Sequence, residues 1–272
     1  MQGTDQRTPQ EIAKELAYGR TLSFKLPSGY DVTIREQNGN DDDILTNSVT
    51  SQDMTNFNIF LASLIIETNL PFAVGGKLTA ATAQQLLLKD KYYIIIRSRI
   101  HSIGEELIIS YDWGEREGGK ITYTEDLNRY IWDYSKPFPE PGTPEYDRER
   151  IEPYEVQEPY SEQIVTLDSG KKIKFHLFNG VSEYIMLKLP LDQVTKNAEI
   201  KARGLMLFDQ GNWTKVENFQ NFRPKEMAEL KRLIKVADPT FRAMTDLKNP
   251  NTGEIVEFSI LASPDFFYPE EI

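Results

Sequence analysis

Residues 79–104 read TAATAQQLLLKDKYYIIIRSRIHSIG and form the strongest helical pattern of the chain. Thr79 is a favoured N-cap residue before a run of Ala, Gln and Leu, and Gly104 is a favoured residue just past a helix end. Asp90 can begin a second helix inside the block. Residues 94–97 alone would also suit a strand, but their helical flanks favour a helix. We therefore predict helices over 79–103, with a restart near Asp90.

Strand patterns lie on both sides of this block. Alternating segments around turn residues predict four β-hairpins. They occupy residues 21–36, 106–127, 163–178 and 244–261. Residues 26–29 and 167–170 share the pattern Leu-x-Ser-Gly, which is either a short internal repeat or a coincidence between two similar turns.

Helical patterns recur between the hairpins. They cover residues 8–18, 41–47, 54–67, 191–203 and 224–236. The last of these has a regular apolar stripe. Because helices and antiparallel hairpins follow each other along the chain, the predicted fold class is α+β, with β-hairpin modules and helical segments between them.

Residues 135–160 differ in composition from both flanks. The segment is rich in Pro, acidic residues and Tyr, and it has little periodic apolar content. Such a composition is typical of a linker or an extended surface strap. We therefore predict an N-terminal α+β module over 1–134, a linker or strap over 135–160, and a C-terminal α+β module over 161–272.

Composition excludes several classes of function. The chain has 272 residues and no cysteine, so a disulfide framework, a thiolate metal site and a cysteine nucleophile are excluded. Its net charge of −11 opposes binding to a phosphate backbone, and we expect no nucleic-acid partner. The apolar run 57–66 is too short for a membrane span, and the first residues lack the pattern of a secretory signal.

The usual catalytic and cofactor motifs are missing from the sequence. His101 and His176 have no catalytic partner at motif spacing and suit ordinary surface positions. The acidic triplet that begins at Asp41 fails the EF-hand pattern and suits a helix N-terminus. No glycine pair forms a nucleotide-binding loop. We therefore predict no enzyme, no cofactor and no metal, while two carboxylates across a cleft would escape detection by sequence.

A family resemblance is visible in the order of elements. In the C-terminal third, the helix 224–236 is followed by the tip NPNTG (249–253), the strand EIVEFSIL (254–261) and SPDFFYP (263–269). This order resembles the T-even-type phage baseplate (hub assembly) protein family. The N-terminal half is similar to that family in its Pro-Ser-Gly hairpin, in LLLKDKYYIIIRSRIHSIGEEL and in the hairpin that ends at Asp126 and Leu127. The resemblance covers about two-thirds of the chain and omits 135–160.

The chain departs from this family at the metal site. Family members resemble zinc-ribbon proteins, with a Cys-Pro-x-Cys-Gly knuckle before a strand, and the resemblance implies a second knuckle near 112–116. Asn249 and Thr252 stand where the cysteines would be. Zinc bound by four thiolates is therefore impossible, although Asn and Gly still suit the turn. We expect zinc-ribbon-like hairpins without metal.

The resemblance implies a non-enzymatic structural or assembly protein of a contractile phage tail baseplate or related injection machine. Its partners would be other tail or baseplate proteins, and a homo-oligomer is a further option. Its location would be the host cytoplasm during assembly, or the virion baseplate. Two alternatives remain open: a small acidic regulator or inhibitor that binds a host protein, and a hydrolase that uses paired carboxylates.

Aromatic side chains are the candidate partner contacts. The strap predicted over 135–160 would lie on a neighbouring subunit, and the aromatic ending of the chain can fill a pocket on a partner or fold onto its own core. Of these two interpretations of the ending, packing on the chain's own core is favoured. The candidate residues are Phe138, Tyr146, Tyr154, Tyr160, Phe266, Phe267 and Tyr268.

Overall fold

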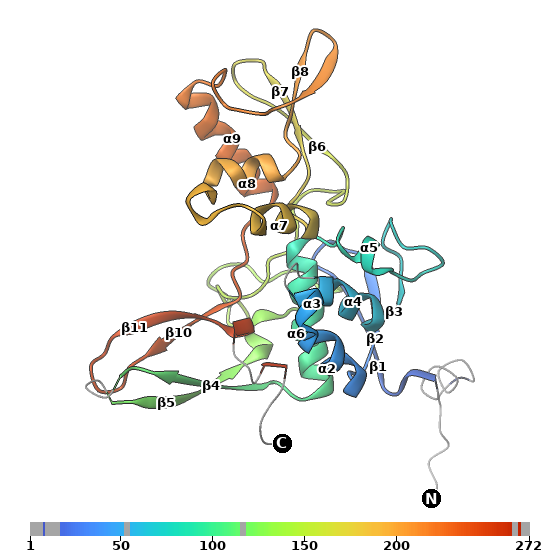
Figure 1. Ribbon diagram of the computed structural model, residues 1–272, viewed down its shortest axis with the longest axis vertical. Helices are drawn as coiled ribbons and strands as arrows, with labels where there is room; N and C mark the ends of the chain where they lie inside the picture. Colours follow the sequence, from blue (N-terminus) through green and yellow to red (C-terminus); the bar gives the residue numbers. More distant parts are fainter. Residues whose placement is uncertain (1–7, 9–16, 52–54, 115–117, 263–265, 268–272) are drawn as a thin grey trace, which may run out of the picture.

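The computed structural model describes residues 8, 17–51, 55–114, 118–262 and 266–267. Figure 1 shows two parts along the longest axis of the molecule. We call the lower part, built from the described residues of 20–152 and 239–267, the body, and the upper part, residues 161–238, the head. Each part has its own hydrophobic core.

The centre of the body combines a small sheet with helices. The antiparallel sheet has the order β1 (Thr21–Lys25), β2 (Asp31–Arg35), β3 (Ile65–Thr68). The helices are α2 (Gly39–Thr46), α3 (Ser48–Ser51), α4 (Thr55–Leu64), α5 (Ala80–Ala83) and α6 (Leu88–Ser102). Helix α6 runs through the core, where Tyr93, Ile94 and Ile96 are fully buried.

Two long hairpins project from the body as an arm. One is β4 (Glu106–Asp112) with β5 (Lys120–Asp126), followed by the turn η2 (Leu127–Tyr130); the other is β10 (Met244–Lys248) with β11 (Ile255–Ser259), followed by η4 (Ile260–Ala262). Figure 1 shows the two hairpins side by side. The Thr245 hydroxyl donates to Glu125 at 2.8 Å, which joins them near the core.

The head is a four-stranded antiparallel sheet with helices beside it. The strand order is β6 (Gln163–Thr166), β7 (Lys172–Phe175), β8 (Met206–Asp209), β9 (Asn212–Lys215). The helices are α7 (Gly180–Leu187), η3 (Leu191–Gln193), α8 (Lys196–Ala202) and α9 (Pro224–Ala237). The Glu226 carboxylate accepts from the Arg223 backbone N–H at 2.7 Å and pairs with Lys171 at 2.9 Å, which fastens the start of α9 to the β6–β7 turn.

The observed fold is α+β, as predicted. The four predicted hairpins and the helix through 94–97 are confirmed. The predicted helix 54–67 is wrong at its end, because Ile65–Thr68 pairs with β2 as a third strand. The predicted helix 191–203 is interrupted, since Val194 is extended and Thr195 caps a new helix. Most of the predicted helix 8–18 lies outside the described residues.

The packing of the last two strands shows a division of the chain that differs from the one predicted from composition. Leu247 and Ile260 belong to the body core, together with residues as early as Leu26, whereas the head core ends at α9. The head is therefore inserted between two stretches that form the body. The predicted boundaries 1–134, 135–160 and 161–272 rested on composition and did not anticipate this return. Among the described residues, no helix is long and apolar enough to cross a bilayer.

Candidate functional site

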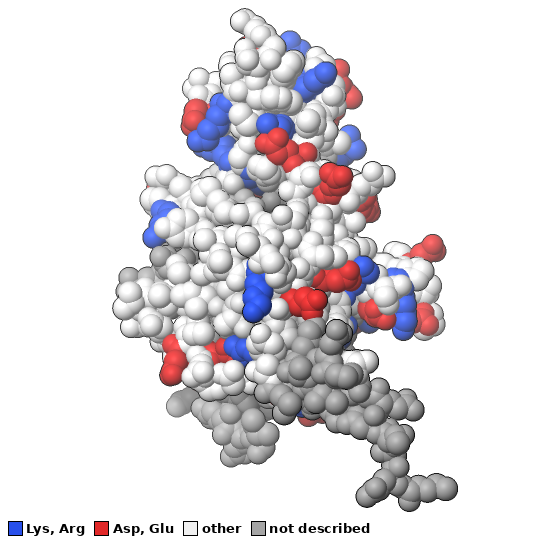
Figure 2. All heavy atoms as spheres, turned by 90° about the vertical axis from the view of Figure 1, so that its right-hand side faces the viewer, with Lys and Arg blue, Asp and Glu red and all other residues white. Residues whose placement is uncertain are grey.

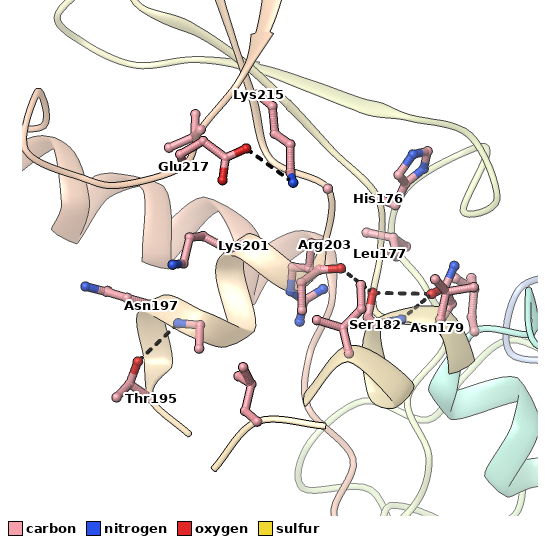
Figure 3. A pocket seen from close by; sticks show the side chains of 18 of the residues that line it. His176, Leu177, Asn179, Ser182, Thr195, Asn197, Lys201, Arg203, Lys215 and Glu217 are labelled. Atoms are coloured by element: carbon pink, nitrogen blue, oxygen red, sulfur yellow. Dashed lines mark hydrogen bonds and ion pairs between the residues drawn. The ribbon is translucent and has the colours of Figure 1, made fainter. Parts of the chain in front are cut away.

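A cleft of about 1280 Å³ lies where the head meets the body. Its walls come from α7, α8 and the loop after β9 in the head, and from residues such as Phe72 and Gln85 in the body. Figure 3 shows side chains from these head elements around the hollow. Its position between two packed parts and its size make this cleft the candidate binding site.

Backbone hydrogen bonds attach the head to the body beside the cleft. Leu88 N donates to Phe178 O at 2.9 Å, Gly180 N to Leu86 O at 3.1 Å, and Val181 N to Gln84 O at 3.1 Å. A Cβ on Gly180 would lie 2.8 Å from the Gln84 carbonyl oxygen, closer than atoms of this kind approach. Glycine at this position therefore allows the start of α7 to reach the chain that leads into α6.

Side-chain hydrogen bonds fix the two helices that line the cleft. Asn179 caps α7 by accepting from the Ser182 backbone N–H at 3.0 Å. The Ser182 hydroxyl donates in turn to Ala202 O, at the end of α8, at 3.0 Å. Since Ser182 is buried, this contact holds α7 and α8 together at one end of the cleft.

The stretch from α7 to the start of α8, which contributes Val181 and Ile185 to the lining of the cleft, is unusually apolar, and we call it the apolar rim. Thirteen large apolar side chains are exposed among the described residues, and five of them fall in the short stretch from α7 to the start of α8. They are Val181, Ile185, Leu187, Leu191 and Val194. Leu191 is 93% exposed, so the structure provides almost no cover for it. A concentration of this kind is typical of an interaction surface.

Cationic side chains exceed acidic ones among the residues that line the cleft. Lys201 and Lys215 are exposed, while Arg203 is buried and bound to Asp238. Lys215 pairs with Glu217 at 3.3 Å, and Figure 3 shows Lys201 below this pair. Glu217 is the only carboxylate among the described lining residues.

A buried polar cluster lies under the cleft at the N-terminus of α6. This helix has no side-chain N-cap; instead, the Tyr160 hydroxyl lies 3.4 Å from the Leu87 backbone N. The same hydroxyl donates to the fully buried Asp90 at 2.6 Å, and the Ser28 backbone N–H donates to Asp90 at 3.1 Å. Burial raises the pKa of Asp90 to about 6.

Lys89 lies beside this cluster. Its ammonium group donates to Pro153 O at 3.2 Å and lies 4.0 Å from the centre of the Tyr154 ring. Burial lowers the pKa of Lys89 to about 8. The groups of this cluster bind one another and the backbone, so the cluster joins the segment 152–160 to α6. It does not present a pair of carboxylates to the cleft.

Charge is distributed unevenly between the two parts. The head, residues 161–238, has 13 Lys and Arg against 10 Asp and Glu, which gives it a net charge of +3. Because the whole chain has a net charge of −11, the remaining residues carry a net charge of −14. Residues 44–88 contain only three charged side chains, Asp53, Glu67 and Lys77. Figure 2, which faces the side of α5 and β3, shows a broad region of the body with few charges below the head.

The candidate aromatic residues of 135–160 are divided between surface and core. Phe138 and Tyr146 are half-buried, and the Phe138 ring contacts Trp132. Tyr154 is buried in the head core, and Tyr160 packs against both cores. The end of the predicted strap thus lies on the chain's own junction between head and body.

The aromatic ending packs largely inside the body. Phe266 is fully buried, and Phe267 contacts the rings of Phe57 and Phe60. These two residues therefore pack on the chain's own core, which was the favoured interpretation. Tyr268 lies outside the described residues.

The turns at the two expected knuckle positions lie next to each other. The Tyr123 hydroxyl accepts from Trp113 Nε1 at 2.8 Å and donates to Lys248 O at 3.1 Å, so it links the two hairpins. Asn249 accepts from the backbone N–H of Asn251 at 2.8 Å and so holds its own turn. Among the described residues, no group of three His, Asp or Glu could hold a metal ion.

The remaining motif residues have local roles. His101 contacts Arg20 O at 3.3 Å, and His176 lies 3.8 Å from Glu162. Asp41 lies in the first turn of α2 and pairs with Arg35 at 2.6 Å, in agreement with the interpretation of the acidic triplet as a helix N-terminus.

The cleft could not be predicted from the sequence. Its walls come from segments far apart in the chain, and α7 was not predicted, although Asn179 before Gly180 was an available N-cap signal. The charge-poor stretch 44–88 was also visible in the sequence and could have indicated an interaction face. No family model, no curated protein and no solved structure matches the chain.

Proposed function

We propose that the chain is a non-enzymatic structural or assembly protein that acts through protein–protein contacts. The observation that carries this proposal is the apolar rim between α7 and α8, where Leu191 is 93% exposed and four other large apolar side chains are exposed close to it in sequence; two of these, Val181 and Ile185, line the cleft. Leaving such a surface in water is unfavourable, and in soluble proteins it commonly marks the contact with a partner.

The charge-poor stretch 44–88 supports the same proposal. The cores of protein interfaces are depleted in charged residues, because burial of an unpaired charge is costly. In this chain the stretch also contributes Phe72 and Gln85 to the cleft, so the apolar rim and the charge-poor part of the body adjoin the same hollow.

The proposed setting is a contractile phage tail baseplate or a related injection machine. It rests on the family resemblance in the order of elements alone. The proposed partners are other tail or baseplate proteins, with self-association as a further option. The proposed location is the host cytoplasm during assembly, or the finished baseplate.

A regulator that binds one host protein is the second candidate. An apolar surface on a chain of net charge −11 favours it as well, since such a protein would need one strong contact surface. The hydrolase alternative needs two carboxylates facing a cleft, and the described lining of this cleft supplies Glu217 alone.

A pull-down separates these proposals. The tagged chain would be recovered from cells that also produce the neighbouring structural proteins, and purified particles would be analysed by mass spectrometry. Recovery of tail or baseplate proteins supports the assembly role, and presence in particles identifies a permanent component. Recovery of one host protein, with particles that lack the chain, would replace the assembly role with the regulator.

A further inference from the structure

The cleft has the dimensions of a site for a chain segment. Its volume of about 1280 Å³ exceeds the roughly 300–1000 Å³ of pockets that enclose drug-sized ligands. We propose that this cleft binds a segment of a partner protein that has apolar side chains on one face and acidic side chains beside them. This inference rests on the proposed function and names the chemistry of the partner.

The apolar half of the site is on α7. Val181 and Ile185 are four residues apart and therefore on the same side of the helix, where they are 41% and 44% exposed. Both line the cleft, and Leu189 continues the lining beyond the end of α7. A row of this kind accepts apolar side chains of an amphipathic segment, as grooves that bind helices do.

The cationic half of the site is on α8 and β9. The Lys201 ammonium forms no ion pair with any described residue, and Lys215 shares its charge only with the exposed Glu217. Arg203 is bound to both Asp238 and Glu199, so its charge is already compensated, although its Nε–H has no hydrogen-bond partner among the described groups. Carboxylates of a bound segment would therefore meet the Lys201 ammonium next to the apolar row.

The charges of the whole chain favour the same orientation. The head carries +3 and the remainder −14, so an acidic segment is attracted to the head and repelled by the body. A nucleic acid fits less well, because the ten acidic residues of the head interrupt its positive charge and the apolar row offers nothing to a phosphate backbone.

Selection from a library of random 16-residue displayed peptides on the full-length chain tests the inference. We expect the selected peptides to combine acidic residues with apolar residues three or four positions apart. Ile185→Glu and Lys201→Glu should each weaken the selected peptides by about tenfold or more, a loss of about 1.4 kcal/mol. Thermal unfolding checks that each variant folds.

Val236→Glu and Lys231→Glu are matched controls on the exposed side of α9, and they should leave the affinity unchanged; Val236 is 52% exposed, close to the 44% of Ile185. The inference is overturned if no peptide is selected, if the selected peptides lack acidic residues, if the cleft and control variants bind alike, or if a single-stranded oligonucleotide displaces the peptides.

The pull-down distinguishes this inference from the proposed function. If wild type and Ile185→Glu recover the same tail proteins equally, the cleft inference fails and the assembly role stands. If neither recovers a protein partner, the assembly role itself fails.

Discussion

Replacing Gly180 with alanine should loosen the attachment of the head to the body. The new methyl group would lie 2.8 Å from Gln84 O, and also 3.3 Å from the carbonyl carbon and Cα of that residue. These are backbone atoms, so relief requires α7 to move away, which strains the hydrogen bonds from Gly180 N to Leu86 O and from Val181 N to Gln84 O. Overpacking of this kind costs roughly 1–3 kcal/mol, and each weakened hydrogen bond contributes about 0.5–1.5 kcal/mol.

Alanine recovers part of this loss, since it favours a helix over glycine by up to about 1 kcal/mol. The net expectation is a decrease of about 1–3 kcal/mol in the free energy of unfolding, measured by urea denaturation followed by circular dichroism. Gly39→Ala is the matched control: Gly39 is also the first residue of its helix, and a Cβ there meets nothing within 4 Å. If Gly180→Ala is as stable as Gly39→Ala, the close approach of α7 to the body is refuted.

Three further substitutions test other contacts. Because burial raises the pKa of Asp90 from 3.8 to about 6, the folded chain keeps a proton that the unfolded chain releases, and this residue's contribution to stability decreases as the pH rises through that window. Asp90→Asn should remove that dependence, so the difference between the wild-type and mutant unfolding free energies should change by about 2 kcal/mol between pH 4 and 6; parallel curves would contradict the assignment. Tyr123→Phe removes both hydrogen bonds of a hydroxyl that links the hairpins and should cost about 1–2 kcal/mol in urea denaturation. Tyr111→Phe is the control: it keeps the ring that makes edge-to-face contacts with Trp113 and Phe258, and it should change stability by less than about 0.5 kcal/mol. The backbone and Lys171 hydrogen bonds lower the pKa of Glu226 to about 2, so Glu226→Gln should lower the melting temperature at neutral pH, and the deficit should disappear as the pH falls from 4.5 towards 2; a deficit that persists at pH 2 would contradict this role.

The hairpins could be predicted because their information is local. Each has alternating strands around a turn with Gly, Asn or Pro, and those residues set both the turn and the register. Strand β3 could not be found in this way, because Ile65–Thr68 becomes a strand only through pairing with the free edge of β2. The run 54–67 is apolar enough to continue as a helix, so tertiary pairing decided its last three residues.

The division into body and head could not be predicted from composition. The Pro-rich segment 135–160 has the composition of a linker, yet Ile151 and Tyr154 are buried, in the body core and the head core respectively. Hydrogen bonds also join this segment to α6, where Lys89 donates to Pro153 O and Tyr160 donates to Asp90. A segment rich in prolines and acidic residues can thus contain a few buried residues that fix it to the core, and its composition does not reveal them.

The candidate site illustrates the same limit. A cleft between two parts depends on the return of the chain after α9, and no local pattern encodes that return. The exposed apolar residues near Leu191 resemble ordinary helix residues in sequence, and only the structure shows that their apolar side has no cover. The scarcity of charge over 44–88 was available in advance, since it is a property of composition alone.

Cross-linking of the complex recovered by pull-down tests the central claim most directly. A lysine-reactive cross-linker followed by mass spectrometry would map where partners contact the chain. The account predicts cross-links to partner proteins at Lys77 on the charge-poor stretch and at Lys188 and Lys196 beside the apolar rim, all of which are exposed. Cross-links confined to Lys120 and Lys248 on the arm would contradict the assignment of the cleft as the contact surface.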